Sequence, residues 1–558
     1  MKRKALAVLL SSAMMLSLAA CGQSETTSSS ASTESTAASS EVESESEEAG
    51  EELPVASDEI LYLGDGDGEV DFDLWMAIHT TTSSFYNSLN EHPGAALWEE
   101  ATGVTVNWIN PPVGEETTNL NLMLNDLDSL PDVFQIGNFD SIYPGGATMA
   151  IEDGVILDIT ELVEEYAPNF MAMINANESL KKDVYNDDGY LTGFGTVIIN
   201  EEKSGNSMRG PIINTEYLEE AGLDLPVTID DWTEMLTAFR DMGVKYPLIY
   251  EEAYLKDCFS GAYGVTQWAD YYVDVEGDGT VKFGPAQDGY KEYLELMNMW
   301  YEEGLLSADF ATDTLTGEVR TAMASGDAGV IIDYVTQFKQ LPVNADSYDY
   351  DLELVGAQYP VLEEGDTAHL RDYEGTRTAL AMYITCNAED PIEIIQWIDQ
   401  MYSEDGRYLN TFGEEGVTYE YVDGVLQYTD LITANPDGLS ETEAGRALIF
   451  KDMFRTWENE DHLLIYTEDS QYDAWDEWNK ADIESELPSM MTMTADESDD
   501  YVKIAATLDT YVAEMRLKFI MGTESFDNWD TYIATLESLE YKDSEAIKQA
   551  AYDRYEAR

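Results

Sequence analysis

The residues best suited to contact a ligand lie where predicted strands end. In open α/β sheets, ligands bind beyond the carboxyl ends of the strands. The candidates are His79, Thr81 and Phe85 after a strand over 71–78, Asn138 and Phe139 after 131–137, Asp333 and Tyr334 after 329–333, and Trp268, Tyr271 and Tyr272 within 264–272. Flat aromatic faces combined with groups that both donate and accept hydrogen bonds suit a sugar, which has apolar C–H faces and a belt of hydroxyls.

Catalytic signatures are few. The four histidines are scattered, and none has a histidine partner at the i+3 or i+4 position of a zinc helix. The chain has no phosphate-binding P-loop, no dinucleotide fingerprint and no G-x-S-x-G nucleophile motif. Carboxylates are so abundant that any chosen glycosidase pair is uninformative. We therefore expect no enzyme, no cofactor and no resident metal, with a surface-anchored glycoside hydrolase as the alternative.

One acidic stretch resembles a calcium loop. DVEGDGTVKFGP places Asp274, Glu276 and Asp278 at loop positions 1, 3 and 5 and Gly279 at position 6. Position 12, which needs a bidentate glutamate, holds Pro285. The competing interpretation is a tight turn between the short strands VDV and TVKF, and we favour the turn.

Alternating strands and helices must position these residues. Strands over 71–78, 104–109 and 131–137 are separated by helical stretches, a pattern typical of βαβ units and a mainly parallel sheet. The alternation restarts beyond 186–199, where Thr228 and Asp231 stand at capping-box spacing before an amphipathic helix. The last 150 residues are predicted to be largely helical. The sequence therefore predicts two α/β lobes and a helical C-terminal part.

The N-terminal segment has the pattern of a secretory signal peptide over 1–20. Basic residues 2–4 precede an apolar run that is too short for a membrane span. The run ends in Leu18-Ala19-Ala20-Cys21, which resembles the bacterial lipobox, so Cys21 is expected to carry lipid and become the first mature residue. Two or more acyl chains anchor a protein stably. Residues 21–60 then form a tether rich in Ser, Thr and Glu, which is predicted to be disordered.

The charge of the chain restricts its partners. The formal net charge is −84, with 112 acidic and 28 basic residues. Nucleic acid is excluded as a partner because phosphates need Lys and Arg, and anionic lipid surfaces and polyanionic ligands are disfavoured for the same reason. Cys258 and Cys386 are the other cysteines, and their spacing leaves open whether they pair.

Several motifs together resemble one known family. They are GVILDITELVEEYAPN, YEEGLLSADF, ITCNAEDPIEIIQWIDQMYSEDG, FGEEGVTYEYVDGVLQYTDLITANPDG, and the terminal LDTYVAEMRLKFIMGTESFDNWDTYIATLESLEY with AAYDRYEAR. The chain resembles the extracellular solute-binding lipoproteins of carbohydrate ABC transporters, in the large Gram-positive subgroup of the family-one sugar-binding proteins. The strong acidity and the loop HTTTSSFYNSLNEHPG depart from that pattern.

The resemblance implies an α/β fold of the two-lobed, periplasmic-binding-protein-like kind (type II), a hinged clam with a helical C-terminal part. Lobe 1 would comprise 61–195 and 376–410, and lobe 2 would comprise 196–375 and 411–558. The chain would cross the hinge near 193–199, 374–378 and 405–412. Because closure is favoured only by contacts made to both lobes, ligand binding would shift the population towards the closed state. A bridge between Cys258 and Cys386 would lock that hinge.

The function implied is capture of a sugar, expected to be a neutral oligosaccharide, and its delivery to the permease subunits of an ABC transporter. The protein would be a monomer held by lipid on Cys21 at the extracellular face of the cell membrane. To the strand-end candidates the resemblance adds Arg377 at a crossing and Trp457 and Trp475 as stacking platforms in the C-terminal part. A cell-wall or glycan adhesion protein is a further alternative.

Overall fold

The computed structural model describes residues 54–558, apart from 67, 199–208, 253–257, 266–269, 276, 370–376, 423, 451–456 and 459–468. The described residues belong to one compact unit, Leu53–Arg558. The predicted signal peptide, Cys21, most of the tether and Trp268 lie outside the described residues. Within the described part of the chain, no helix combines the length and the apolar character needed to cross a membrane.

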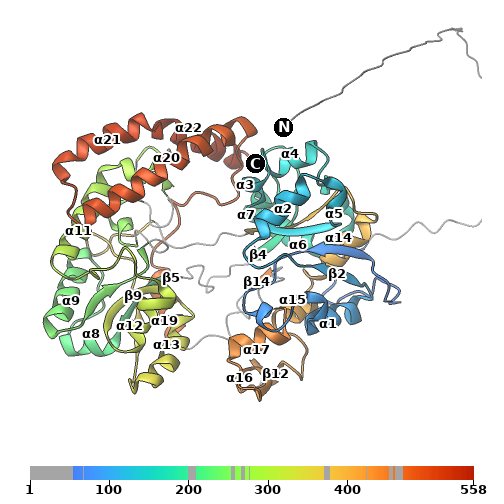
Figure 1. The fold of residues 1–558 in the computed structure, drawn as a ribbon, viewed down its shortest axis with the longest axis horizontal. Coiled ribbons are helices and arrows are strands. Elements are labelled where there is room, and N and C mark those ends of the chain that lie inside the picture. The colour runs from blue at the N-terminus through green and yellow to red at the C-terminus, as the bar shows by residue number, and fades with distance from the viewer. Residues whose placement is uncertain are drawn as a thin grey trace, which may run out of the picture. The chain divides into compact units, whose positions relative to one another are not determined.

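The first lobe is built on a six-stranded mixed sheet in the order β14-β4-β11-β3-β1-β2 (Figure 1). β2, β1 and β3 are parallel, as predicted, but β11 runs antiparallel to both of its neighbours. β11 enters this sheet after the chain has passed through the second lobe. The strands are β1 (Phe72–Trp75), β2 (Val106–Ile109), β3 (Val133–Gly137), β4 (Phe194–Ile198), β11 (Arg377–Ile384) and β14 (Trp457–Glu458).

Aromatic residues fill the core of this lobe. Trp397 is fully buried, and its ring lies 5.1 Å from Phe72, 6.0 Å from Trp98 and 6.2 Å from Trp108, measured between centroids. Each such ring buries a large apolar area, so the cluster holds helices against the sheet. The helices of the lobe are α1 (Pro93–Thr102), α2 (Glu116–Leu124), α3 (Phe139–Ile142), α4 (Gly146–Glu152), α5 (Thr160–Tyr166), α6 (Pro168–Ala176), α7 (Glu178–Val184), α14 (Pro391–Gln400) and α15 (Glu404–Thr411).

The second lobe has a four-stranded sheet in the order β10-β5-β9-β6, of which only the β6–β9 pair is parallel. The prediction of a mainly parallel sheet is therefore wrong for this lobe. The strands are β5 (Arg209–Asn214), β6 (Tyr246–Ile249), β9 (Ala328–Tyr334) and β10 (Leu354–Gly356). A separate hairpin pairs β7 (Tyr271–Val273) with β8 (Val281–Phe283).

The helices of this lobe follow the predicted apolar stripes. The capping box of Thr228 and Asp231 is present at the start of α9, and Trp232, Leu236 and Phe239 are fully buried on one face of that helix. The helices are α8 (Thr215–Ala221), α9 (Ile229–Met242), α11 (Asp288–Glu302), α12 (Arg320–Ala324), α13 (Gln337–Ala345), α19 (Asp469–Trp478), α20 (Ala495–Ile520), α21 (Trp529–Ser538) and α22 (Tyr541–Glu556).

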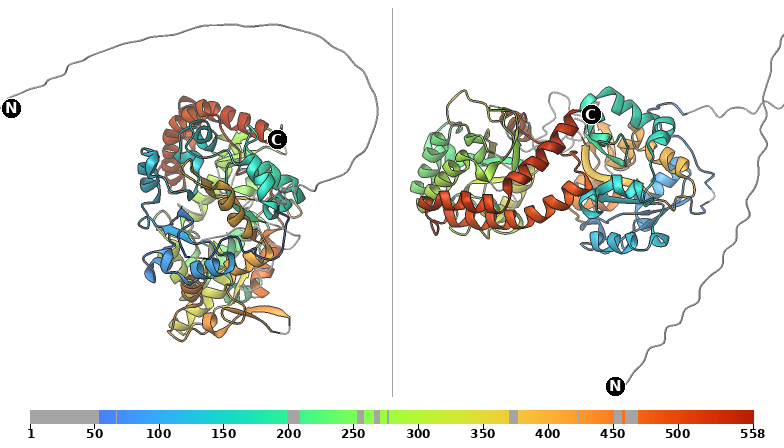
Figure 2. Two further views of the ribbon diagram at one scale, coloured as in Figure 1. Left: turned by 90° about the vertical axis from the view of Figure 1, so that its right-hand side faces the viewer. Right: turned by 90° about the horizontal axis from the view of Figure 1, so that it is seen from above.

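The end of the chain returns to the first lobe. Arg554 donates to Asp187 (2.9 Å) and to Glu497 (2.6 Å), while Arg558 donates to Asp187 (2.8 Å). Burial would raise the pKa of Asp187, but hydrogen bonds from the two arginines outweigh it and lower the pKa. The C-terminus accordingly lies beside α7 and α3, at the end of the helices α20–α22 drawn in red (Figures 1 and 2).

The chain passes between the two sheets three times. The first passage joins β4 to β5 and the second joins β10 to β11, near two of the predicted crossings. The third lies between β14 in the first sheet and α19, which packs on β10. The predicted crossing at 405–412 is wrong, because those residues form helix α15 in the first lobe, where Trp98 donates to Asn410 (2.6 Å).

A small subdomain follows α15. Its elements are β12 (Tyr419–Val422), β13 (Val425–Tyr428), α16 (Asp430–Thr433) and α17 (Glu441–Leu448). It is anchored to the first lobe, since Tyr86 donates to the carbonyl of Ala447 (2.8 Å) and Thr82 to that of Arg446 (3.2 Å). β14 also pairs with β4. The predicted lobe boundary at 411 is therefore too early in the sequence, and the first sheet extends to Glu458.

Asp399 gives the first lobe a pH-dependent stability. Its carboxylate is buried and accepts hydrogen bonds from the backbone N–H groups of Asn169 and Phe170, yet burial raises its pKa to about 7. Because an unfolded aspartate has a pKa of about 3.9, the folded state binds more protons than the unfolded state between the two pKa values. Stability then falls as pH rises from about 4 to about 7. Relative to wild type, Asp399→Asn should gain up to about 1.4 kcal/mol per pH unit across this window.

Urea denaturation of both proteins at several pH values measures this difference. If the difference in free energy of unfolding between Asp399→Asn and wild type is the same at pH 4 and pH 7, the raised pKa of Asp399 is contradicted. Exposed Asp405, also on the first lobe, offers a comparison: Asp405→Asn should show a much weaker pH dependence, since its carboxyl is far less buried.

Candidate functional site

The residues that follow β3 line one side of a polar cavity. Asn138 is exposed and adopts a left-handed conformation (φ 55°), which turns the chain out of the strand and into α3. Asn tolerates this region better than most residues. Asp140 then accepts a hydrogen bond from the backbone N–H of Ala147 (2.7 Å), so its carboxylate fixes the start of α4 against α3. The strand end is thereby held rigidly beside the cavity.

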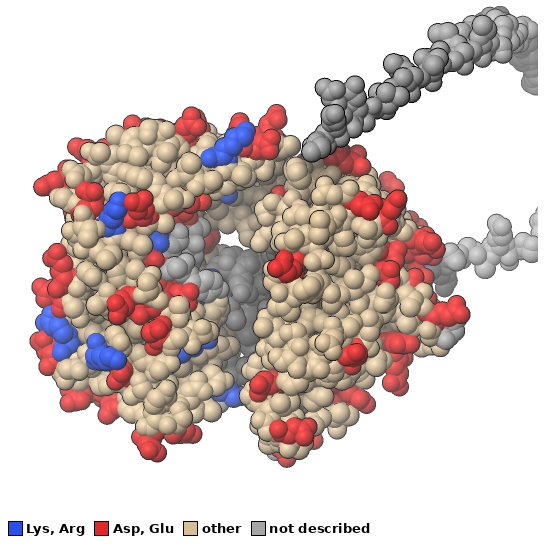
Figure 3. Space-filling view, viewed as in Figure 1, with Lys and Arg blue, Asp and Glu red and all other residues tan. Residues whose placement is uncertain are grey.

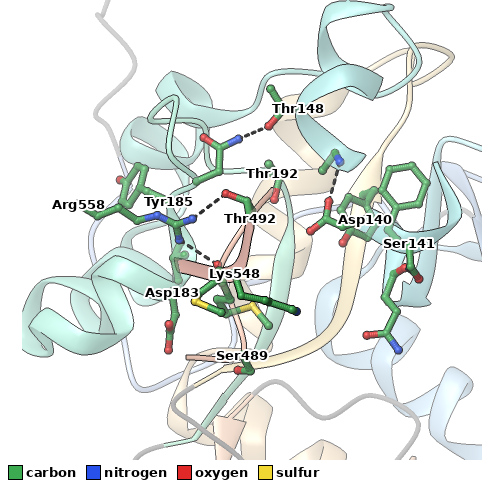
Figure 4. Close-up of a pocket in the computed structure, with 18 residues that line it drawn as sticks. Asp140, Ser141, Thr148, Asp183, Tyr185, Thr192, Ser489, Thr492, Lys548 and Arg558 are labelled. Carbon is green, nitrogen blue, oxygen red and sulfur yellow. Dashed lines mark hydrogen bonds between the residues drawn. The ribbon is translucent and has the colours of Figure 1, made fainter. Parts of the chain in front are cut away.

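The cavity has a volume of about 380 Å³ and is shown in Figure 4. Hydroxyl and amide groups line it, and Asn186 donates to Thr148 (2.7 Å) across one wall. Tyr383 and Tyr185 contribute aromatic surface. The polar lining residues are Asn138, Asp140, Ser141, Thr148, Asp183, Asn186, Thr192, Ser489, Thr492, Lys548 and Arg558.

Two cations enter the cavity wall from the C-terminal part. Arg558 donates to the hydroxyl of Thr492 (2.9 Å) and to the carbonyl of Met490 (3.0 Å), contacts that order residues 489–492 (Figure 4). The amine of Lys548 lies 4.6 Å from the centre of the Tyr501 ring, and burial lowers the pKa of this lysine. The wall therefore combines lobe 1 residues with the last helix of the chain.

The loop after β1 lies at the same edge of the sheet as Asn138. β1 and β3 are parallel, with Leu74 opposite Val133, so His79 and Asn138 follow equivalent positions of adjacent strands. His79 is exposed, and its Nδ1 accepts from the N–H of Thr81 (3.1 Å). Thr81 and Phe85 are half-buried around a short 3₁₀ turn. The parallel pairing thus places the loop after β1 and the residues after β3 at one edge of the sheet, while His79, Thr81 and Phe85 are not among the residues that line the cavity.

In the second lobe, Asp333 does not offer a free carboxylate. Its side chain is 0% exposed and forms a bidentate ion pair with Arg320, with both N···O distances 2.8 Å. The prediction that Asp333 binds ligand hydroxyls is therefore wrong. Tyr334 is half-buried, it lies opposite Arg209 at the end of β9, and its ring centre is 5.7 Å from the Arg209 guanidinium carbon.

Two other predicted platforms are also buried. The ring of Phe139 is 1% exposed and packs 4.7 Å from that of Tyr383, so it supports the cavity wall from behind. Trp475 is 2% exposed in the core of the second lobe. Arg377 and Trp457 begin β11 and β14, but their side chains are not described. Tyr271 and Tyr272, also near-buried, belong to β7.

The calcium-like stretch is a turn. β7 and β8 pair directly, and Asp274 N–H bonds the carbonyl of Thr280 (2.9 Å). The Asp278 carboxylate accepts from the Thr280 hydroxyl (2.5 Å), pairs with Lys282 (3.1 Å) and accepts from Thr280 N–H (3.1 Å), and these contacts lower its pKa to about 2. Glu276 lies outside the described residues. Cys258 is buried and Cys386 is exposed, and the two are not joined by a disulfide.

The sequence did not predict Arg558, which lines the cavity, its neighbour Arg554, or Arg209, which lies beside Tyr334. Arg209 was missed because the sequence around it contains no motif. Arg554 and Arg558 gave a usable signal: with only 28 basic residues in the chain, two arginines four residues apart at the end of a helix suggest a specific contact. Elsewhere acidic side chains predominate, as the face in Figure 3 shows.

The fold has two mixed β-sheets, between which the chain passes three times, and polar and aromatic side chains lie at the strand ends. This architecture is that of the two-domain class of solute-binding proteins. The match to a family model is consistent with that architecture. Residues 79–408 match the model of the bacterial extracellular solute-binding proteins, and the chain belongs to this family.

Known relatives span most of the chain. A fructooligosaccharide ABC transporter substrate-binding protein, FusA of Streptococcus pneumoniae, is 24% identical over 82% of this chain and 86% of its own. Lipoprotein LipO of Bacillus subtilis is 27% identical over 56% of this chain and 62% of its own. The polygalacturonan/rhamnogalacturonan-binding protein YtcQ of Bacillus subtilis is 22% identical over 57% and 61%.

Solved structures share the fold. FusA in complex with kestose has a TM-score of 0.66 at 20% identity, covering 87% of this chain and 99% of FusA. An HMO-binding, ABC-transporter-associated solute-binding protein from Bifidobacterium longum infantis has a TM-score of 0.71 at 17% identity, covering 88% of this chain and 99% of its own. The alginate-binding protein AlgQ2 without calcium has a TM-score of 0.66 at 21% identity, covering 89% and 99%.

Proposed function

We propose that this protein captures an oligosaccharide between its two lobes and delivers it to the permease of an ABC importer. The observation that carries the proposal is family membership combined with similarity to FusA along most of both chains. The polar strand ends around His79, Asn138 and Tyr334 support it, because they supply the hydrogen-bonding groups and the aromatic face that a sugar needs.

The ligand is proposed to be a neutral oligosaccharide. The chain carries −84 formal charges, which repel polyanionic glycans at long range. Neutral fructooligosaccharides such as kestose are the first candidates to test, with polygalacturonate oligomers as the acidic comparison. The physical signal for transport is lobe closure, since only a ligand that touches both lobes shifts the open–closed equilibrium.

A glycan panel tests this proposal directly. Thermal unfolding is measured with each sugar, together with an assay for new reducing ends. Stabilisation by one neutral class without new reducing ends supports capture for transport. Turnover of the sugar would identify a hydrolase instead, and binding without compaction in small-angle scattering would identify an adhesion protein.

Tyr334→Ala should weaken binding of the sugar found by the panel about tenfold or more. Loss of an aromatic stacking face removes on the order of 1.5 kcal/mol of contact energy. Tyr334→Phe keeps the ring and should bind nearly as well as wild type. Tyr348→Ala removes an exposed tyrosine from another part of the lobe and is the matched control. Isothermal titration gives the affinities, and unchanged binding by Tyr334→Ala would remove this residue from the site.

We propose that lipid on Cys21 holds the protein at the extracellular face of the membrane, with residues 22–60 as the tether. The lipobox-like sequence and the composition of the segment that follows it support this location. A monomer is proposed to dock with the permease subunits. Tethering keeps the protein near the permease, which raises its effective concentration there.

A further inference from the structure

We propose that His369, Asp482 and Glu484 form a binding site for one divalent transition-metal ion, with Zn²⁺ the best fit. One ligand atom from each side chain lies within 4.8 Å of the others. This proposal goes beyond sugar capture and does not depend on it. It differs from the calcium-like turn at 274–285, which supplies oxygen groups only and uses Asp278 for contacts within the turn.

The arrangement of His369 and Asp482 already resembles a metal site in its spacing. The His369 Nδ1 atom lies 3.0 Å from each carboxylate oxygen of Asp482. Two ligand atoms of a tetrahedral zinc ion, each bound at about 2.0–2.1 Å, are about 3.3 Å apart. An ion can therefore replace the proton shared by the imidazole and the carboxylate with very little movement of either side chain.

The backbone holds the two segments side by side. Asp482 N–H donates to the carbonyl of Ala368 (2.9 Å), and Ser485 N–H donates to the carbonyl of His369 (3.3 Å). Glu484 N–H donates to the Asp482 carboxylate (3.1 Å), so the chain turns here and brings the Glu484 side chain to the same place. Binding does not have to order these segments first, and the entropic cost is small.

The local charge also favours a cation. Within the described part of the chain, no lysine or arginine forms an ion pair with Asp482 or Glu484. His369 and Asp482 are partly buried, with side chains 26% and 37% exposed, while Glu484 is exposed and can rotate towards the ion. One imidazole and two carboxylates suit Zn²⁺ better than Mg²⁺ or Ca²⁺, which prefer oxygen-only sites. A water molecule would complete four-coordination.

The site would join two segments that lead to the first lobe. His369 precedes the passage to β11, and residues 482–485 precede 489–492, which line the cavity in Figure 4. A metal ion here would fasten the two segments together within the second lobe and raise the unfolding temperature of the protein.

Isothermal titration of the purified, chelator-treated protein with ZnCl₂ tests the proposal. We expect wild type to bind one zinc ion per chain. His369→Ala and the isosteric Glu484→Gln should each bind zinc about tenfold or more weakly. Zinc should raise the unfolding temperature only of proteins that retain the site. Glu364→Gln removes an exposed carboxylate five positions before His369 in the sequence and should titrate like wild type. MgCl₂ and CaCl₂ should not compete with zinc.

Two results of the zinc titration would overturn the proposal. Many weak zinc sites that are unchanged in His369→Ala and Glu484→Gln would show general attraction to the acidic surface and would overturn the proposal. So would an absence of heat and of stabilisation in wild type. A variant whose unfolding temperature in the presence of chelator is lower than that of wild type is damaged in its fold. If His369→Ala is damaged in this way, Glu484→Gln still decides the test, because it changes only an exposed side chain.

Discussion

Arg320→Met should destabilise the protein by about 3–5 kcal/mol at pH 7, because it leaves the Asp333 carboxylate buried without its partner. Asp333 is 0% exposed, and both of its oxygens accept from Arg320 at 2.8 Å. The backbone N–H of Tyr334 also donates to Asp333 Oδ1 (2.7 Å), but this neutral donor cannot neutralise the charge. Urea unfolding at pH 7 measures the loss of free energy.

The variant should also respond to pH. Burial raises the pKa of Asp333 and Arg320 opposes that effect, so removing the arginine raises the pKa further. A raised folded pKa means that the folded state holds its proton to higher pH, so the variant should be closest to wild type in acid and fall behind as pH rises.

Two further variants test the cause. Asp333→Asn combined with Arg320→Met should recover much of the loss, because it removes the unpaired charge. Lys245→Met breaks the exposed pair with Asp327 and should change stability little. If Arg320→Met were as mild as Lys245→Met, the ion pair would not be a structural element of the second lobe.

Cys21→Ser should release the protein from the membrane fraction into the medium while leaving sugar affinity unchanged. The lipid is proposed to be attached through the Cys21 thiol, and a serine cannot carry a thioether. Fractionation of cells followed by immunoblotting gives the distribution, and titration with the sugar gives the affinity.

Cys386→Ser is the matched control for this experiment. Cys386 is an exposed free thiol on the folded body, so its loss should leave the protein in the membrane fraction. Retention of the Cys21→Ser variant in the membrane would contradict the lipobox interpretation, whatever the outcome of the sugar titration.

The local features of the fold could be predicted from the sequence. The capping box of Thr228 and Asp231 and the apolar face of α9 depend on residues a few positions apart, and the structure confirms them. The strand ends that carry His79 and Asn138 follow from the same short-range patterns. Non-local pairing could not be predicted: β14 has two residues, too few for a pattern, and it alone shows that the first sheet extends past residue 411.

The candidate site was predicted less well for a related reason. Asp333 has the appearance of a ligand residue at a strand end, but Arg320 reaches it from 13 residues away. The burial of Trp475 could have been predicted from the sequence, because Trp478 follows it at i+3, on the same face of a helix. Both tryptophans are buried in the structure. Aromatic residues in this chain are abundant, and helical spacing is a better guide to burial than residue type alone.

The order of strands in the first sheet has a consequence for how the chain folds. β11 lies between β4 and β3, although it is made more than 170 residues after β4 ends, with the whole second sheet between them. During synthesis, all four strands of the second sheet are made before β11. Until β11 is made, the first sheet lacks the strand that lies between β4 and β3. Such long-range closure is slow, so exposed edges of β3 and β4 are the part of the nascent chain most in need of protection from aggregation.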